Sequence, residues 1–299
     1  MTELELQHLR REKWRLDGDP VRTFEQALEF VDSVGMCLLY PVRPMPLLPT
    51  LIGAVVGTDQ KLPLRTSAFA DDRGKEAEEL SARLTRNKFA FEARLYGETL
   101  LLSPDVFSYY YAVASDRKPK QPIRSREQGK ASPLAEHLFQ KLEEGGPLTR
   151  AQLQEQLRGA LSEAALDRAL DELSSALKIT VVDHNPKAGD TWDLYYRWAS
   201  EAINEGVRMS DAEGLSALIS KYLDCVVAAT EEEIETFFSA ISSRARVAEV
   251  VKALLSAREF TYTPSETRTL ITVAHSFVRS ETPSTGTKTG THASRRRNG

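Results

Sequence analysis

The side chains best suited to chemistry in this sequence are cations in positions that can reach phosphate. Arg244 and Arg246 open a predicted helix, and six Lys or Arg residues lie between Arg117 and Lys130. Such groups neutralise phosphates, and the first residues of a helix-turn-helix recognition helix face the major groove. The sequence has no Gly-rich phosphate loop, Ser-His-Asp arrangement or HExxH string. These residues therefore predict contact with nucleic acid.

Each of these cations also has a simpler interpretation, as part of a solvated helix face or of a charged linker. Arg43 lies between Pro41 and Pro44 and is suited to hold a phosphate bidentately. The predicted DNA-binding residues are Arg43, Arg117, Lys118, Lys120, Arg124, Arg126, Arg244 and Arg246.

Several other residues have one functional and one structural interpretation. Tyr109–Tyr111 could stack on unpaired bases, but three successive helical residues point three ways, so at least one is expected in the core. Trp192 and Trp198 are expected to be core aromatics, and His184 to be a residue of a wing turn. Arg295–Arg297 could tether a terminal tail to DNA.

Length and charge exclude some classes of protein. The chain has 299 residues, 41% hydrophobic residues and a formal net charge of −4, which is not the all-over basic composition of a histone-like protein. Charge is uneven, at +1 over residues 1–132, −8 over 133–280 and +3 over 281–299. The length predicts two or three domains.

Cysteine and histidine are too sparse for a metal site. Cys37 and Cys225 lie in apolar settings and are expected to be buried thiols rather than a bridge. We therefore expect no metal and no cofactor. The charged N-terminus resembles no signal peptide, and no apolar run is long enough to span a bilayer, so a cytoplasmic protein without membrane contact is expected.

Helical patterns dominate the first part of the chain. Residues 23–34 predict a helix that begins after Thr23 and ends at Gly35. The prolines of residues 37–49 predict an extended segment, and helices are expected at 49–56 and 71–87. A further apolar helix is expected over residues 88–113, with Ser103 or Asp105 beginning its last part.

After the basic segment, one pattern occurs twice. Residues 134–198 and 212–273 each predict a helix, a short helix, a longer helix and a β-hairpin whose strands form a wing. Thr149 and Ser162 are expected to begin two of these helices, and Thr230 with Glu233 has the spacing of a capping box. This order of elements is typical of the winged helix-turn-helix, and its repetition supports the interpretation.

The residues that carry this pattern resemble a known family. PLTRAQLQEQL, ALDRALDELSSALKITVVD and DAEGLSALISKYLDCVVAATEEEIETFF are similar to the HTH_42 family of tandem winged-helix proteins, which includes the AlkZ/YcaQ-type DNA glycosylases. ALEFVDSVGMCLLYP resembles the family segment in which a helix ends at Gly before an extended motif that ends at Pro. The resemblance implies a fold that is mainly α with small β-hairpin wings (α+β), built from tandem winged helix-turn-helix modules.

The predicted organisation has three modules, a linker and a tail. A divergent winged-helix-like module is expected over residues 1–114 and a basic linker over 115–132. The middle and C-terminal winged-helix modules are expected over 133–208 and 209–280, and a disordered basic tail over 281–299.

The resemblance also locates a possible catalytic motif. Active members carry Gln-apolar-Gln or Gln-apolar-Asp just before the Pro, and alignment between Gly35 and Pro41 puts Leu38 and Tyr40 at the two polar positions. Leucine cannot orient a water, and neutral tyrosine carries no negative charge to steady an oxocarbenium-like centre. The identity of any catalytic residue therefore stays unknown. Gln152–Gln154 spells the same motif, but inside a predicted helix of the wrong module.

Three functions follow from these observations. The first is binding of double-stranded DNA without base excision. The second is an active DNA glycosylase that excises alkylated or crosslinked bases with other residues, such as Tyr40, Glu25 or Glu29. The third is a protein-interaction scaffold, which the acidic residues 133–280 would suit.

Overall fold

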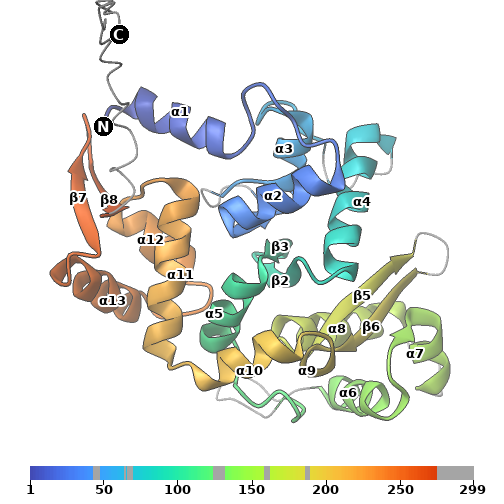
Figure 1. The fold of residues 1–299 in the computed structure, drawn as a ribbon. Helices are drawn as coiled ribbons and strands as arrows, with labels where there is room; N and C mark the ends of the chain where they lie inside the picture. The colour runs from blue at the N-terminus through green and yellow to red at the C-terminus, as the bar shows by residue number, and fades with distance from the viewer. Residues whose placement is uncertain are drawn as a thin grey trace, which may run out of the picture.

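The computed structural model describes residues 1–42, 48–63, 65, 70–123, 132–157, 162–185 and 189–274. It contains one structural unit three times: a helix, a short strand that is reduced to a single bridge in the third copy, two helices and a β-hairpin (Figure 1). This is the order of a winged helix-turn-helix, so the predicted fold class of a mainly helical chain with small β-hairpin wings is confirmed.

The three repeats have matching elements. Repeat 1 consists of α2 (Phe24–Val34), β1 (Met36–Leu38), α3 (Leu51–Val56), α4 (Asp72–Arg86), β2 (Phe91–Leu95) and β3 (Glu98–Leu102). Repeat 2 consists of α6 (Pro133–Gly145), β4 (Leu148–Thr149), α7 (Arg150–Gln156), α8 (Glu163–Ser175), β5 (Ile179–Asn185) and β6 (Gly189–Leu194). Repeat 3 consists of α11 (Asp211–Val226), α12 (Glu231–Phe238), α13 (Arg244–Ser256), β7 (Phe260–Pro264) and β8 (Thr269–Val273).

The sheets of the repeats also correspond. Their antiparallel strand orders are β1-β3-β2 and β4-β6-β5, and β7 pairs with β8. The first strand of repeat 3 is reduced to a single bridge between Ala229 and Ile271. The remaining helices are α1 (Glu3–Lys13), α5 (Pro104–Ala114), α9 (Tyr195–Trp198) and α10 (Ser200–Arg208).

Threonine caps fix where helices begin in all three repeats. Thr230 forms the predicted capping box with Glu233, and Thr149 and Thr23 form further capping boxes with Gln152 and Gln26. In repeat 2 the capping threonine, Thr149, is the last residue of β4. In repeat 3 the capping threonine, Thr230, directly follows the bridged residue Ala229. In repeat 1 the matching cap, Thr50, lies 12 residues beyond Leu38, with which it forms a bridge. The extra residues lie in the segment that contains the motif position.

The helix predicted over residues 88–113 is wrong, because its first half is the wing of repeat 1. Phe91, Ala93 and Leu95 are buried and alternate with partly exposed residues, as in a strand with one face on the core. Tyr96 and Gly97 both have positive φ, 51° and 81°, which a type I′ hairpin turn requires. The helix α5 begins only at Pro104, after the unbonded cap Ser103.

The second wing strand of repeat 2 is also shorter than predicted. It ends at Leu194, and α9 occupies residues that the sequence suggested were strand.

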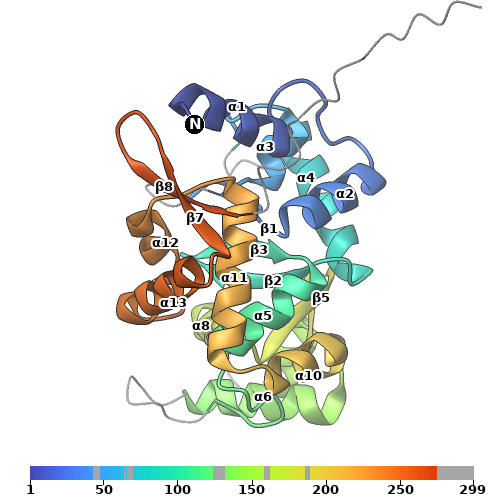
Figure 2. The same cartoon turned by 60° about the vertical axis from the view of Figure 1, so that its left-hand side comes forward.

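The hydrophobic core does not follow the repeats one by one. Repeat 2 has its own core, whereas repeats 1 and 3 share one that also includes residues of α5, α9 and α10. Figure 2 shows α5 and α11 side by side between these repeats. Cys37 and Cys225 are free and buried in the shared core, as predicted. The domain boundaries stay a prediction.

Repeats 1 and 2 cover each other reciprocally. The third helix of repeat 1, α4, packs on wing strand β5 of repeat 2, and the third helix of repeat 2, α8, packs on wing strand β2 of repeat 1. The third helix of repeat 3, α13, packs mainly against α11, α12 and β7 of its own repeat. In Figure 1 it lies at the edge of the molecule, away from β5 and β6.

The N-terminal helix α1 closes the C-terminal end of α11. Arg10 is 7% exposed and donates from Nε to the Val226 carbonyl at 2.9 Å and from Nη2 to the Ala228 carbonyl at 2.6 Å. Trp14 donates its indole N–H to the Cys225 carbonyl at 2.9 Å. The last carbonyls of a helix lack intrahelical partners, so these side chains supply them.

In the part of the chain that the structure describes, no helix is long and apolar enough to cross a bilayer.

Replacement of Arg10 by Ala is expected to destabilise the protein by about 2–4 kcal/mol, since it leaves two buried carbonyls without donors. The measurement is urea unfolding followed by circular dichroism. The control is Arg11→Ala on the same helix, which removes partly exposed ion pairs with Asp17 and Asp59 and should cost about 1 kcal/mol. Equal losses in the two variants would contradict the capping role.

Candidate nucleic-acid interface and motif position

Leu38, the first of the two motif positions, lies on β1, all of whose residues are buried. Leu38 is 1% exposed and pairs with Leu100 of β3. Its side chain is part of the core shared by repeats 1 and 3, and it offers no polar atom. Leucine has no hydrogen-bond donor or acceptor in its side chain, so Leu38 cannot hold a water molecule as a glutamine would.

Tyr40, two residues on, is also buried but has a polar atom. It is 2% exposed, and its hydroxyl has no hydrogen-bond partner within 3.5 Å in the described chain. Burial and the nearby carboxylate of Glu78 raise the pKa of Tyr40 far above its usual value, so the hydroxyl is neutral. The hydroxyl therefore interacts with the Glu78 carboxyl group without a hydrogen bond shorter than 3.5 Å.

Glu78 is a potential functional residue that the sequence did not indicate. It lies on α4 and is partly buried, and burial raises its pKa, while Tyr40 and Arg65 act in the opposite direction. A carboxyl group with a raised pKa beside a motif position is a candidate acid or base. Its pairing with Tyr40 depends on packing across 38 positions of sequence, so no local pattern could have revealed it.

The two carboxylates predicted as alternatives have a different environment. Glu25 and Glu29 lie on the exposed face of α2. The backbone and the Thr23 hydroxyl lower the pKa of Glu25, and Glu29 forms an ion pair with Arg15 at 2.9 Å. Neither has the burial that would prepare a carboxyl group for acid–base work.

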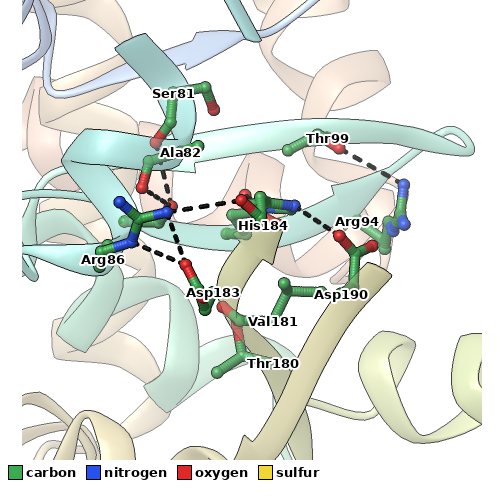
Figure 3. A network of polar contacts seen from close by, with 12 residues as sticks. Ser81, Ala82, Arg86, Arg94, Thr99, Thr180, Val181, Asp183, His184 and Asp190 are labelled. Atoms are coloured by element: carbon green, nitrogen blue, oxygen red, sulfur yellow. Dashed lines mark hydrogen bonds and ion pairs between the residues drawn. The ribbon is translucent and has the colours of Figure 1, made fainter. Parts of the chain in front are cut away.

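A polar bridge joins repeats 1 and 2 beside this site. His184, on β5, lies 3.0 Å from a carboxylate oxygen of Glu92 on β2 and 3.0 Å from one of Asp190 on β6. Arg86, at the end of α4, donates to Asp183 at 2.7 Å (Figure 3). The sequence suggested a turn residue at His184, whereas the structure places it in a strand between two acids.

The charge of His184 follows from these partners. Burial lowers its pKa, but the hydrogen bonds and charges of Asp190 and Glu92 act more strongly, and the result is a pKa raised to about 10. His184 is therefore an imidazolium near neutral pH, and the bridge carries a positive charge between two negative ones.

The predicted cations of residues 115–132 are only partly available to phosphate. Arg117 donates from Nε and Nη2 to the Ala112 carbonyl at 2.9 and 2.7 Å and so closes the end of α5. Lys118 and Lys120 are exposed, and Lys120 lies 6.0 Å from the Tyr196 ring centroid. Arg43, Arg124 and Arg126 lie outside the described residues.

Arg244 and Arg246 lie in the first turn of α13, as predicted, where Ser243 caps the helix. Arg244 is exposed and lies 3.5 Å from the Thr236 hydroxyl. Arg246 is shared between Glu249 at 2.8 Å and Asp211 at 3.7 Å, and these acids raise its pKa. Arg244 is thus the more available of the two cations.

Several of the other residues singled out in the sequence have structural roles, whereas Arg295–Arg297 lie outside the described residues. Gln152 accepts hydrogen bonds from Thr149 within the capping box of α7, which gives it a structural role in repeat 2. Tyr110 and Tyr111 are core residues, as is Trp192. Trp198 is partly buried and packs against the shared core. Within the described segments, no group of His, Cys, Asp and Glu residues is arranged to hold a metal ion.

Replacement of His184 by Gln is expected to destabilise the protein more at pH 6.5 than at pH 9.5, by about 1–2 kcal/mol after allowance for partial exposure. The folded pKa lies above the unfolded value, so the contribution is complete below about pH 6.5 and is lost as pH rises towards 10. Urea unfolding at both pH values is the measurement. His137→Gln, at an exposed position on α6, is the control and should show no such difference. A pH-independent effect of His184→Gln would contradict the charged bridge.

Comparison with known proteins supports the resemblance seen in the sequence. Residues 72–291 match the family described as DNA glycosylase AlkZ-like. The solved structure of Streptomyces sahachiroi DNA glycosylase AlkZ is similar, with a TM-score of 0.60 over 91% of this chain and 70% of that chain. Sequence identity is 15%, so this likeness concerns the fold. No curated protein sequence matches. Because the family match spans most of the chain, the protein belongs to the AlkZ-like DNA glycosylase family.

Proposed function

We propose that this protein binds double-stranded DNA through repeat 3 and does not excise bases. The observation that carries the proposal is the position of α13. Of the three third helices, α4 and α8 are packed on the wing of a neighbouring repeat, whereas α13 is packed mainly within its own. A recognition helix enters the major groove with its exposed face, and no neighbouring wing is among the main contacts of α13.

The charge of the third helices agrees with this choice. The first two turns of α13 hold Arg244 and Arg246, and the exposed Lys252 follows two turns later. By contrast, α8 presents exposed carboxylates at Glu163, Asp167 and Asp171, which would repel phosphates. The acidic start of α12 would also repel them, so α13 is the cationic approach of repeat 3.

The absence of base excision is inferred from the motif position. Base excision develops positive charge on the sugar, which a carboxylate or an oriented polar group must stabilise. Leu38 is a core leucine, and Tyr40 has a neutral hydroxyl buried at 2% exposure. Neither side chain supports that chemistry.

The double variant Arg244→Ala/Arg246→Ala is expected to weaken duplex binding and to reduce the slope of log K against log salt by about 1–2, one unit for each lost phosphate contact. Fluorescence anisotropy with a labelled duplex at several salt concentrations is the measurement. Arg168→Ala, an exposed arginine on α8, is the matched control and should change neither quantity. No duplex binding by the unaltered protein at low salt would overturn the proposal and favour the protein-interaction scaffold.

One observation favours a second function, base excision with non-standard residues. Glu78 is a partly buried carboxyl group with a raised pKa, and it lies beside the hydroxyl of Tyr40. An acid and a polar group are therefore available next to Leu38. In this case Glu78 would act on the departing base or on water, in place of the missing polar pair.

Base release from alkylated DNA distinguishes the two functions. The leading proposal predicts no release by the unaltered protein, even under conditions in which it is bound. Release that is lost in Glu78→Gln but kept in Glu79→Gln, its exposed neighbour, would establish the second function and overturn the first. A loss of at least about 100-fold is expected in that case, as for removal of a general acid or base.

A further inference from the structure

Cations and aromatic rings gather where α4 ends and repeat 1 meets α9. We name this cluster the α4 patch, and it consists of Phe24, Arg83, Lys88, Phe89 and Trp198. None of these residues contributes to the DNA contact proposed for α13 or to the motif position. Its side chains come from α2, α4, the turn that follows α4, and α9.

The geometry of the α4 patch alternates charge and ring. The guanidinium of Arg83 lies 4.5 Å from the Phe24 ring centroid, and the Phe24 and Phe89 rings meet edge to face at 5.9 Å. The Nζ of Lys88 lies 4.5 Å from the Trp198 ring. Phe89 is 40% exposed, an unusual position for a phenylalanine.

The local backbone explains why these side chains are presented to solvent. Lys88 has a φ of 61°, and the backbone N–H groups of Lys88 and Phe89 donate to the carbonyls of Thr85 and Leu84. This is the Schellman pattern that ends a helix, and it turns the chain sharply after α4. Phe89 therefore leaves the helix at its end rather than continuing along its buried face.

The same junction in the other repeats does not form such a patch. Repeat 2 has Leu177 and Lys178 there, both buried. Repeat 3 has Arg258, with the same φ of 61°, followed by the exposed acid Glu259. Only the junction of repeat 1 presents a cation and an aromatic ring together, so the helix ending alone does not account for the patch.

The two cations of the patch are not neutralised by acids in contact with them. Within the described chain, neither Arg83 nor Lys88 has a carboxylate within 4.0 Å. The nearby carboxylate of Asp183 pairs with Arg86 instead, at 2.7 Å. Glu25 interacts with Arg83 only as a more distant negative charge. The local balance therefore favours an anionic ligand.

We propose that the α4 patch binds single-stranded DNA, with an unpaired base stacked on Phe89 and phosphates held by Arg83 and Lys88. Aromatic rings interleaved with cations fit a strand whose planar bases alternate with charged phosphates. An acidic peptide could pair with Arg83 and Lys88 but has no base to stack on Phe89. The exposed phenylalanine ring therefore favours a nucleic acid as the ligand. This site is separate from the duplex contact of α13 and does not depend on it.

The test is titration of the full-length protein with a labelled oligo(dT) strand, followed by anisotropy. Phe89→Ala is expected to weaken binding about tenfold through loss of one stacked base. Lys88→Gly should weaken it several-fold and reduce the salt slope by about 0.7, the value for one phosphate on a single strand. Because glycine suits the positive φ of this position, Lys88→Gly should be no less stable than the unaltered protein, so a binding loss would not reflect unfolding.

Arg258→Gly is the matched control, because it removes a cation at the equivalent junction with the same backbone conformation. It should change oligo(dT) binding less than twofold. Tryptophan emission gives a second readout: oligo(dT) should quench it, and Trp198→Phe should remove most of the quenching.

Several outcomes would overturn the proposal. These are no oligo(dT) binding at low salt, equal losses in Lys88→Gly and Arg258→Gly, or binding of a poly-Glu peptide as tight as that of oligo(dT). The duplex proposal fails separately. Arg244→Ala/Arg246→Ala should affect the duplex but not oligo(dT), and Phe89→Ala should affect oligo(dT) but not the duplex.

Discussion

The reciprocal packing of the first two repeats is the constraint on which the rest of the structure depends. Each repeat lays its third helix on the wing of the other, and the contact is bridged by Glu92, His184 and Asp190 and by the Arg86–Asp183 pair. This arrangement uses one side of two potential recognition helices for packing between repeats, whereas α13 packs mainly within its own repeat. The choice of a DNA-binding element is thus a consequence of how the repeats bury each other.

A second constraint acts on the motif position. The strand β1 lies in a core shared by repeats 1 and 3, and the same core holds residues of α11, whose end α1 closes through Arg10. A polar residue at Leu38 would need partners within this core. The protein keeps the scaffold of its family but has an apolar core residue at this position, and Tyr40 and Glu78 are polar residues beside it.

The sequence predicted repeats 2 and 3 well, because their signals are local. Thr149 and Thr230 are N-cap residues that indicate where α7 and α12 begin, and the spacing of apolar residues indicates the helices that follow. The wing of repeat 1 was missed since its run of apolar residues also suits a helix, and the decisive signal was the Tyr96–Gly97 turn. Arg244 was placed correctly at the start of α13, whereas Arg117 proved to be a helix cap.

The polar partnerships could not be predicted in the same way. His184 meets Glu92 from 92 positions away, and Glu78 meets Tyr40 through the packing of α4 against α2 and α3. The Schellman ending of α4, which exposes Phe89, has no glycine to mark it. In each case the information lies in tertiary packing rather than in spacing.

Hydrogen exchange, measured by mass spectrometry with and without a duplex oligonucleotide, tests the central claim most directly. The account predicts slower exchange over the first half of α13 on binding, with α4 and α8 unchanged, because α4 packs on β5 and the exposed face of α8 is acidic. Slower exchange in α8, or none in α13 at saturating duplex, would contradict it.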